Sequence, residues 1–93
     1  VCGNDDMAVG AMKAIKERGL SIPNDYSLTG FDDGLISRVT EPNLTTVKIP
    51  LTDMANIAIK KLIDGIQNPG NIIPKQVLPC TMIIRPSTGR PKT

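Results

Sequence analysis

The sequence predicts an α/β fold with a parallel sheet, and its first third carries the evidence. A short run that ends in polar residues, Val1–Asp5, is followed at once by a helical pattern. A second run of the same kind, Leu28–Asp33, comes after that helix. A strand, a helix and a strand in this order form a βαβ unit with parallel strands. Ligands of open α/β sheets sit outside the carboxyl ends of the strands. The two polar ends, with Asn4 and Asp32, therefore predict one pocket for a hydroxyl-rich small molecule.

Length and composition limit what this chain can be. It has 93 residues, of which 40% are hydrophobic and 22% charged, which indicates a small globular domain with a limited core. The chain starts with Val1 rather than Met, in what looks like the end of a strand, so we expect the C-terminal piece of a longer protein. The only aromatic residues are Tyr26 and Phe31, which argues against a surface that stacks nucleic-acid bases.

The charged and sulfur-containing residues exclude further classes. The net charge is +2 and the basic residues are dispersed, so we expect no DNA contact by these residues. Cys2 and Cys80 match no metal-ligand spacing and no His is present, so we expect two small buried thiols in a reducing compartment. No apolar run approaches the roughly 20 residues needed to cross a membrane.

The first helix is the best-defined element of the sequence. It is predicted over Asp6–Arg18, with Asp5 as the N-cap and Gly19 as the left-handed residue that ends it. Apolar residues recur at helical spacing between Ala8 and Ile15, which predicts one buried face.

The remaining elements alternate between extended and helical patterns. Strands are predicted over Tyr26–Phe31 and Leu44–Ile49, with one helical turn at Leu35–Arg38 between them. A last extended stretch covers Gln76–Arg85, where Pro79 must break the strand or lie at an edge.

The second predicted helix, Leu51–Ile66, is apolar over most of its circumference. Such a helix is usually buried on more than one side, so it needs partners that these 93 residues do not supply. The last stretch, residues 86–93, has no packing pattern and predicts a flexible tail.

Taken in order, six segments of the chain resemble the lactose-repressor (LacI/GalR) family of transcription regulators. Each motif is weak alone, but their order and spacing are specific and cover nearly the whole chain. The segments are Gly3–Ala11, Gly19–Pro23, Gly30–Asp33, Leu44–Val47, Leu78–Pro79 and Arg85–Thr88.

The resemblance implies a periplasmic-binding-protein-like core (type I) of two α/β lobes, of which only a part is present. Residues 1–49 would belong to the C-terminal lobe and residues 50–78 would pack with the N-terminal lobe. Residues 79–85 would form the return strand. The helix-turn-helix that binds DNA would lie upstream.

The resemblance also assigns residues to an effector site. It implies that Asn4 and Asp32 contact the effector and that Phe31 forms a wall. Each residue also has an alternative role. Asn4 could be a turn residue whose side chain bonds its own backbone before the helix, and Asp32 could be a solvated turn carboxylate. Phe31 could pack in the core. Asp33 is expected to organise the turn by bonding local N–H groups, and Asp5 to cap the helix.

Dimerisation is the family's other role. Six residues align with the surface through which family cores pair, although a Met–Val patch also suits an ordinary core. These residues are Val9, Met12, Lys13, Arg38, Val39 and Thr40.

Together these features predict the effector-binding and dimerisation portion of a cytoplasmic, sugar-responsive transcriptional repressor. Its partners would be a sugar, a related polyol or a nucleobase, a second copy of the chain, and operator DNA through the upstream head. We expect no cofactor, metal or membrane contact. The alternative is a periplasmic sugar-binding protein of a transport system on the same fold. Upstream sequence separates the two hypotheses, because a regulator has a helix-turn-helix and a transport protein a signal peptide.

An enzyme is a third hypothesis, in which Asp32 and Asp33 hold a divalent cation. No phosphate-binding loop, activated nucleophile or His accompanies these residues, so we expect no catalysis.

Overall fold

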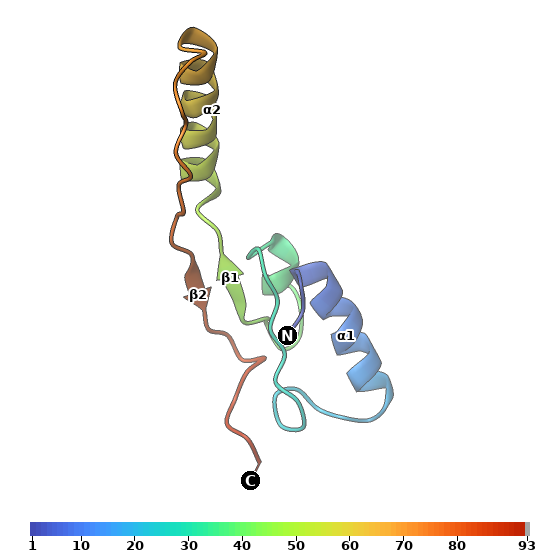
Figure 1. Cartoon of the computed structure of the whole chain (residues 1–93). Coiled ribbons are helices and arrows are strands. Elements are labelled where there is room, and N and C mark those ends of the chain that lie inside the picture. Colours follow the sequence, from blue (N-terminus) through green and yellow to red (C-terminus); the bar gives the residue numbers. More distant parts are fainter. Residues whose placement is uncertain (93) are drawn as a thin grey trace. The chain divides into compact units, whose positions relative to one another are not determined.

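A computed structural model describes residues 1–92 (Figure 1). Its elements are α1 (Asp5–Glu17), the 3-10 turn η1 (Leu35–Arg38), β1 (Thr46–Lys48), α2 (Leu51–Gln67) and β2 (Thr81–Ile83). The chain divides into two compact units, one formed by residues 1–49 together with the stretch from Thr81 onward, and the other by residues 50–80. Each unit is described by itself.

Helix α1 begins one residue earlier than the sequence predicts, because Asn4 and not Asp5 is its N-cap. Asn4 has an extended backbone (φ −156°), and its side-chain oxygen accepts a hydrogen bond from the Met7 N–H at 2.8 Å. Asp5 is the first helical residue and points into the unit. The helix ends as predicted, with Gly19 at φ 74° and the Leu20 N–H bonded to the Ile15 carbonyl at 3.2 Å.

Three segments of the first unit run parallel. The Cys2 N–H bonds the Thr29 carbonyl at 2.9 Å, and the Gly30 N–H bonds the Thr45 carbonyl at 2.9 Å. Further along, the same pairs of segments are joined by bonds from Asp5 N–H to Phe31 O and from Asp32 N–H to Val47 O, both 3.0 Å. Residue numbers rise together along both pairs, so all three segments point the same way.

The predicted strand over Tyr26–Phe31 is nevertheless too long. Only Thr29 forms a bridge, a parallel one with Thr45. The ladder stops at Asp32, whose φ of 111° turns the backbone out of the extended conformation.

The two named strands form a two-stranded antiparallel sheet. Strands β1 and β2 lie side by side in Figure 1, with Thr46 opposite Ile83 and Lys48 opposite Thr81. The extended stretch predicted over residues 76–85 thus contributes only three strand residues, and they begin two positions after Pro79. Parallel pairing in this unit is confined to the isolated bridge and the bonds around it.

The core of the first unit is small. Its buried apolar side chains are Ala8 and Met12 on α1 together with Leu28 and Leu44 from the parallel segments. Polar side chains fill much of the remaining interior, where burying a polar group without a hydrogen-bond partner is destabilising. The most buried of these residues are Asp5, Ser37, Thr45, Thr46 and Ser87.

The flexible tail predicted from residue 86 is wrong at its start. Ser87 is fully buried, and its hydroxyl donates to the Leu28 carbonyl at 2.6 Å while accepting from the Thr45 N–H at 2.8 Å. Thr88 shares a 2.8 Å hydroxyl hydrogen bond with Thr45. Because these partners lie more than 40 residues away, no local pattern revealed the packing.

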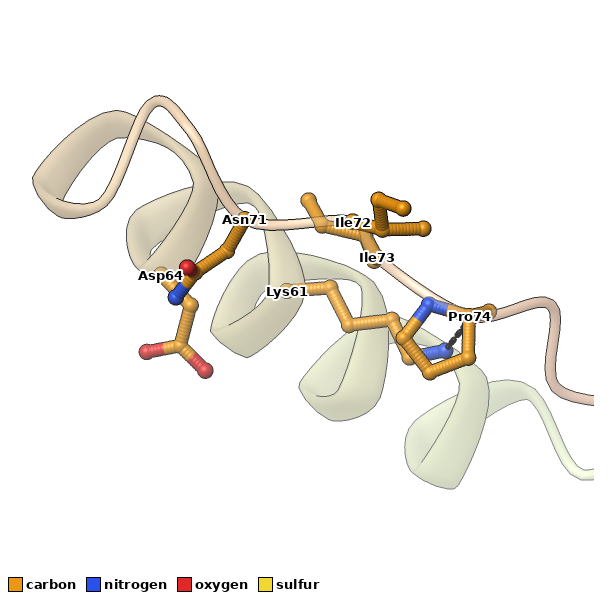
Figure 2. Close-up of a pocket in the computed structure, with 6 residues that line it drawn as sticks. All are labelled: Lys61, Asp64, Asn71, Ile72, Ile73 and Pro74. Carbon is orange, nitrogen blue, oxygen red and sulfur yellow. Dashed lines mark hydrogen bonds between the residues drawn. The ribbon is translucent and has the colours of Figure 1, made fainter.

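The second unit consists of α2 and the chain that returns along it. Helix α2 starts after Pro50 as predicted. Lys61 donates to the Pro74 carbonyl at 2.6 Å (Figure 2). The Ile73 side chain lies so close to Gly65 that a Cβ on this glycine would be 2.9 Å from Ile73 Cδ1. No residue of α2 is buried within residues 1–92. Large apolar side chains are exposed along this unit, among them Leu51, Ile59, Leu62, Ile66, Ile72 and Val77.

The two cysteines are free, Cys2 half-buried and Cys80 exposed, so the expectation of a buried thiol is wrong for Cys80. In the part of the chain that the structure describes, no helix has the length and apolar character that crossing a membrane requires.

Candidate functional site

The turn at residues 31–34 is held by hydrogen bonds from the backbone N–H groups of residues 32, 33 and 34. Asp32 and Asp33 both have positive φ, 111° and 53°, which is uncommon for residues other than glycine. The Asp32 N–H is held by Val47, as described above. The Asp33 N–H donates to the Thr46 hydroxyl at 3.2 Å, and the Gly34 N–H donates to the Asp5 carboxylate at 2.7 Å. These three bonds hold the turn in a conformation that would otherwise be strained.

Asp5 joins the start of α1 to this turn and to β1. Only 3% of its surface is exposed, and its second carboxylate oxygen accepts a hydrogen bond from the Thr46 hydroxyl at 2.7 Å. Gly30 lies against the same carboxylate so closely that a Cβ there would be 2.3 Å from Oδ1. Asp5 is therefore a structural residue, as the sequence suggested, but it acts through tertiary contacts and not as the helix cap.

Asp33 forms the central ion pairs of the site. Its carboxylate, with 6% of the side chain exposed, accepts from Arg85 at 2.8 Å and from Arg38 at 3.2 Å. Burial by itself would raise the pKa of Asp33, but the hydrogen bonds and positive charges of Arg85 and Arg38 outweigh it and hold the pKa below its usual value. The expected bonds to local N–H groups are absent from the hydrogen bonds of residues 1–92, because the two guanidinium groups occupy the carboxylate.

Arg85 was missed as a site residue by the sequence analysis. It stands 52 residues from Asp33, so no spacing connects them. The available signal was a lone arginine directly after an apolar stretch, in a segment that already carried the family resemblance.

The structure brings Asn4, Phe31 and Asp32 to one edge. The hydrogen bond from Asp5 N–H to Phe31 O sets residues 4–5 beside residues 31–32. Asp32 is exposed, and within residues 1–92 no hydrogen bond or ion pair involves its carboxylate. Phe31 is 38% exposed and lies outside the core cluster. Asn4 performs the local capping that was its alternative role, through its oxygen, and its amide nitrogen donates to none of the residues described.

The paired-acid cation site is not supported by this geometry. The Asp33 carboxylate faces two guanidinium groups, whose positive charges would repel a cation. Among residues 1–92, no three His, Cys, Asp or Glu side chains gather as a metal site would require.

The residues expected at a dimer interface divide into two groups, and the first lies on α1. Val9 and Lys13 line a shallow depression of about 430 Å³. The depression is also lined by Met12, Lys16 and Glu17. Met12 itself is only 5% exposed because it packs in the core with Ala8, Leu28 and Leu44. Its place among the contact residues is therefore corrected, since it offers little surface to a partner.

The second group follows η1. Arg38 keeps 57% of its side chain exposed while it pairs with Asp33, and Val39 is 67% exposed. The Thr40 hydroxyl is enclosed and bonds to nothing in the described chain, so it is not presented to a partner. Lys16 donates to the Glu41 carbonyl, which places this segment beside α1. The segment of the second group thus lies next to the helix that carries the first group.

Known proteins resemble the chain over most of its length. The model of the periplasmic binding protein-like domain family matches residues 1–88, so the chain belongs to that family. Within it, the chain is a member of the LacI/GalR group of transcription regulators. The HTH-type transcriptional regulator AscG of Escherichia coli is 52% identical over 63 residues, which are 68% of this chain and 19% of AscG. An uncharacterized HTH-type regulator of Streptomyces limosus is 40% identical over 90 residues, 97% of this chain and 26% of that protein. The chain thus spans at most about a quarter of either relative.

Solved structures agree with this assignment. A LacI family regulator from Enterococcus faecium with bound ribose superposes with a TM-score of 0.80 and 35% identity, covering 92% of this chain and 32% of that one. The lac repressor dimer bound to operator and the anti-inducer ONPF superposes with a TM-score of 0.82 and 34% identity. The match covers 92% of this chain and 30% of the lac repressor chain.

Proposed function

We propose that this chain forms part of the effector-binding and dimerisation core of a sugar-responsive transcriptional repressor. The observation that supports it most directly is the rim of the first unit. There the exposed Asp32 carboxylate, which has no partner within residues 1–92, stands on a turn in which the backbone N–H groups of residues 32, 33 and 34 are all hydrogen-bonded. A carboxylate acceptor held at the carboxyl end of a strand suits the hydroxyl groups of a sugar or polyol.

The Asn4 side chain complements this acceptor. Its oxygen is used by the Met7 N–H, which leaves the amide nitrogen as a donor at the same edge. Phe31 adds an apolar surface beside these two polar groups. Donor, acceptor and apolar wall together provide the groups that orient a small polyol. The E. faecium neighbour holds ribose and an Alkaliphilus metalliredigens neighbour holds D-xylulofuranose, which favours a sugar as the effector.

The second unit fits the proposal through its unsatisfied apolar surface. An exposed apolar helix such as α2 is rare on a free monomer. We assign residues 50–78 to packing with the other lobe of the core, and residues 1–49 with the return strand to the lobe that carries Asp32. Effector bound between two lobes favours one orientation of them and so changes how paired heads fit operator DNA. Such a regulator acts on DNA in the cytoplasm and catalyses no reaction.

The test of this proposal is the substitution Asp32→Asn in the intact protein. Asn tolerates positive φ and has the shape of Asp, so the change removes the charge without adding strain, which Ala would add at φ 111°. We expect sugar affinity to fall by roughly tenfold or more, since a hydrogen bond to a charged acceptor contributes about 1.5–3 kcal/mol. Calorimetric titration with D-ribose, D-xylulose, D-galactose and D-glucose measures the effect on whichever sugar binds.

The matched control is Glu17→Gln, which removes one exposed carboxylate at the other end of α1. It should leave sugar affinity unchanged. Equal affinity in Asp32→Asn and the unaltered protein, or binding of none of the four sugars, would contradict the proposal.

A further inference from the structure

Arg85 is held at both its backbone and its side chain. Its N–H donates to the Thr45 hydroxyl at 2.9 Å, and the same hydroxyl donates to its carbonyl at 2.8 Å. Its guanidinium group donates to the Ser37 hydroxyl at 2.9 Å, the Leu44 carbonyl at 3.0 Å and the Asp33 carboxylate at 2.8 Å. Only 16% of this side chain is exposed. Burying this charge costs solvation free energy, which the hydrogen bonds to these three acceptors must offset.

Asp33 depends on this arginine more than on its other partner. Arg38 approaches the second carboxylate oxygen at 3.2 Å with more than half of its side chain in solvent, and such exposed pairs are weak. Arg85 supplies the shorter, enclosed bond. The planar guanidinium spans three acceptors at once, which a lysine ammonium on a flexible stem does less well.

We propose that Arg85 is a positioning residue for Asp32. Asp32 and Asp33 are consecutive and share a peptide bond, and both have positive φ. Fixing the Asp33 side chain therefore restrains the Asp33 α-carbon and, through the shared peptide bond, the Asp32 α-carbon from which the Asp32 side chain projects. Arg85 touches no ligand in this scheme; it sets the direction of the one carboxylate that does. The inference rests on the proposed function for the identity of the ligand, but the anchoring itself is a property of the turn.

The experiment compares three variants of the intact protein: Arg85→Met, Arg85→Lys and Asp32→Asn. Met removes the guanidinium and keeps only an unbranched apolar chain that reaches as far as the Arg85 Nε position, whereas Lys keeps the charge but not the planar fork. Hydrogen exchange of the amides of residues 32–34 reports on the turn without any sugar. Calorimetry with D-ribose, D-xylulose, D-galactose and D-glucose reports on binding of the sugar that the unaltered protein prefers.

In Arg85→Met we expect faster exchange at residues 32–34, unchanged exchange in α1, and sugar affinity about tenfold lower, by analogy with the loss of a group that orients a metal ligand. Arg85→Lys should lie between Arg85→Met and the unaltered protein in both measurements. A merely structural arginine would instead loosen α1 and the turn together, and that result would overturn the inference.

The two failures are distinguishable. Weaker binding in Asp32→Asn with unchanged binding in Arg85→Met would overturn the positioning role and leave the proposed function standing. Unchanged binding in Asp32→Asn would overturn the proposed function and the role of Arg85 in it. Faster exchange at residues 32–34 of Arg85→Met would then still show that Arg85 anchors the turn.

Discussion

At the scale of single residues, the site depends on close approaches that only particular side chains permit. Gly30 has no Cβ, and this lets the buried Asp5 carboxylate reach both the Gly34 N–H and the Thr46 hydroxyl. A Cβ on Gly30 would also lie 2.9 Å from the Leu44 side chain and 3.2 Å from the Asp5 α-carbon. A Cβ on Gly30 would thus meet both the Asp5 carboxylate and the Leu44 side chain. Moving the carboxylate away would break its hydrogen bonds, and moving the leucine would disturb the core packing.

The substitution Gly30→Ala tests this crowding. We expect the intact protein to lose about 1–3 kcal/mol of unfolding free energy, the range typical of overpacked cores. Urea unfolding followed by circular dichroism measures it. Gly10→Ala is the matched control, because nothing lies within 4 Å of a Cβ on that residue of α1. There Ala should stabilise the protein by up to about 1 kcal/mol through helix propensity alone. Equal stabilities of the two variants would contradict the proposed crowding.

Residue-scale chemistry also marks where sequence analysis stops. The acids of the site were visible as residues that follow a strand, but their partners were not. Asp33 meets Arg85 across 52 residues of chain, and Asp5 meets Thr46 across 41. Which acid stays exposed and which is buried is decided by those distant partners. Asp32 and Asp33 are neighbours with opposite surroundings for that reason alone.

At the scale of elements, helices were predictable and strands were not. The bounds of α1 and α2 differ from prediction by one residue, because caps, Gly and Pro act within a few positions of one another. The observed strands β1 and β2 have only three residues each, fewer than the sequence predicted. The segment predicted as a tail is packed into the first unit at Ser87. Both errors involve pairings with distant segments, which the period of an apolar pattern does not encode.

The N-terminus of α1 carries two roles that one pair of variants can separate. Asn4→Asp retains an oxygen acceptor for the Met7 N–H but removes the amide donor, whereas Asn4→Ala removes both. We expect Asn4→Ala to lose about 1 kcal/mol of stability, the usual value of a helix cap, and Asn4→Asp to lose much less. Both should weaken sugar binding if the amide contacts the effector. Chemical unfolding and calorimetry on the same intact proteins make the comparison. If Asn4→Asp preserves sugar affinity, the Asn4 amide does not contact the effector and the residue acts only as the helix cap.

At the scale of the whole molecule, two different surfaces bear on the proposed packing and pairing. The exposed apolar residues of α2 fit the proposed packing against another lobe, and the match to the Streptomyces limosus relative covers only 26% of that protein. The side of the first unit that combines Val9, Lys13, Arg38 and Val39 is more mixed in polarity, which suits an interface between folded copies. The lac repressor neighbour is itself a dimer bound to operator.

Pairing through this side predicts a clear response to a charge placed in it. In the intact protein, Val39→Asp should raise the dimer dissociation constant by about thirtyfold, which corresponds to about 2 kcal/mol for a central contact that loses its packing. Val39 is 67% exposed, so the substitution should leave the fold of the unit unchanged. Tyr26→Asp is the control, because Tyr26 is also exposed but lies outside the proposed interface. Sedimentation equilibrium across a range of concentrations measures both variants.

A dimer weakened equally by the two substitutions, or by Tyr26→Asp alone, would place the interface elsewhere. Selective weakening by Val39→Asp should also lower operator affinity, because two heads held together bind two half-sites with a far higher effective concentration than free monomers do.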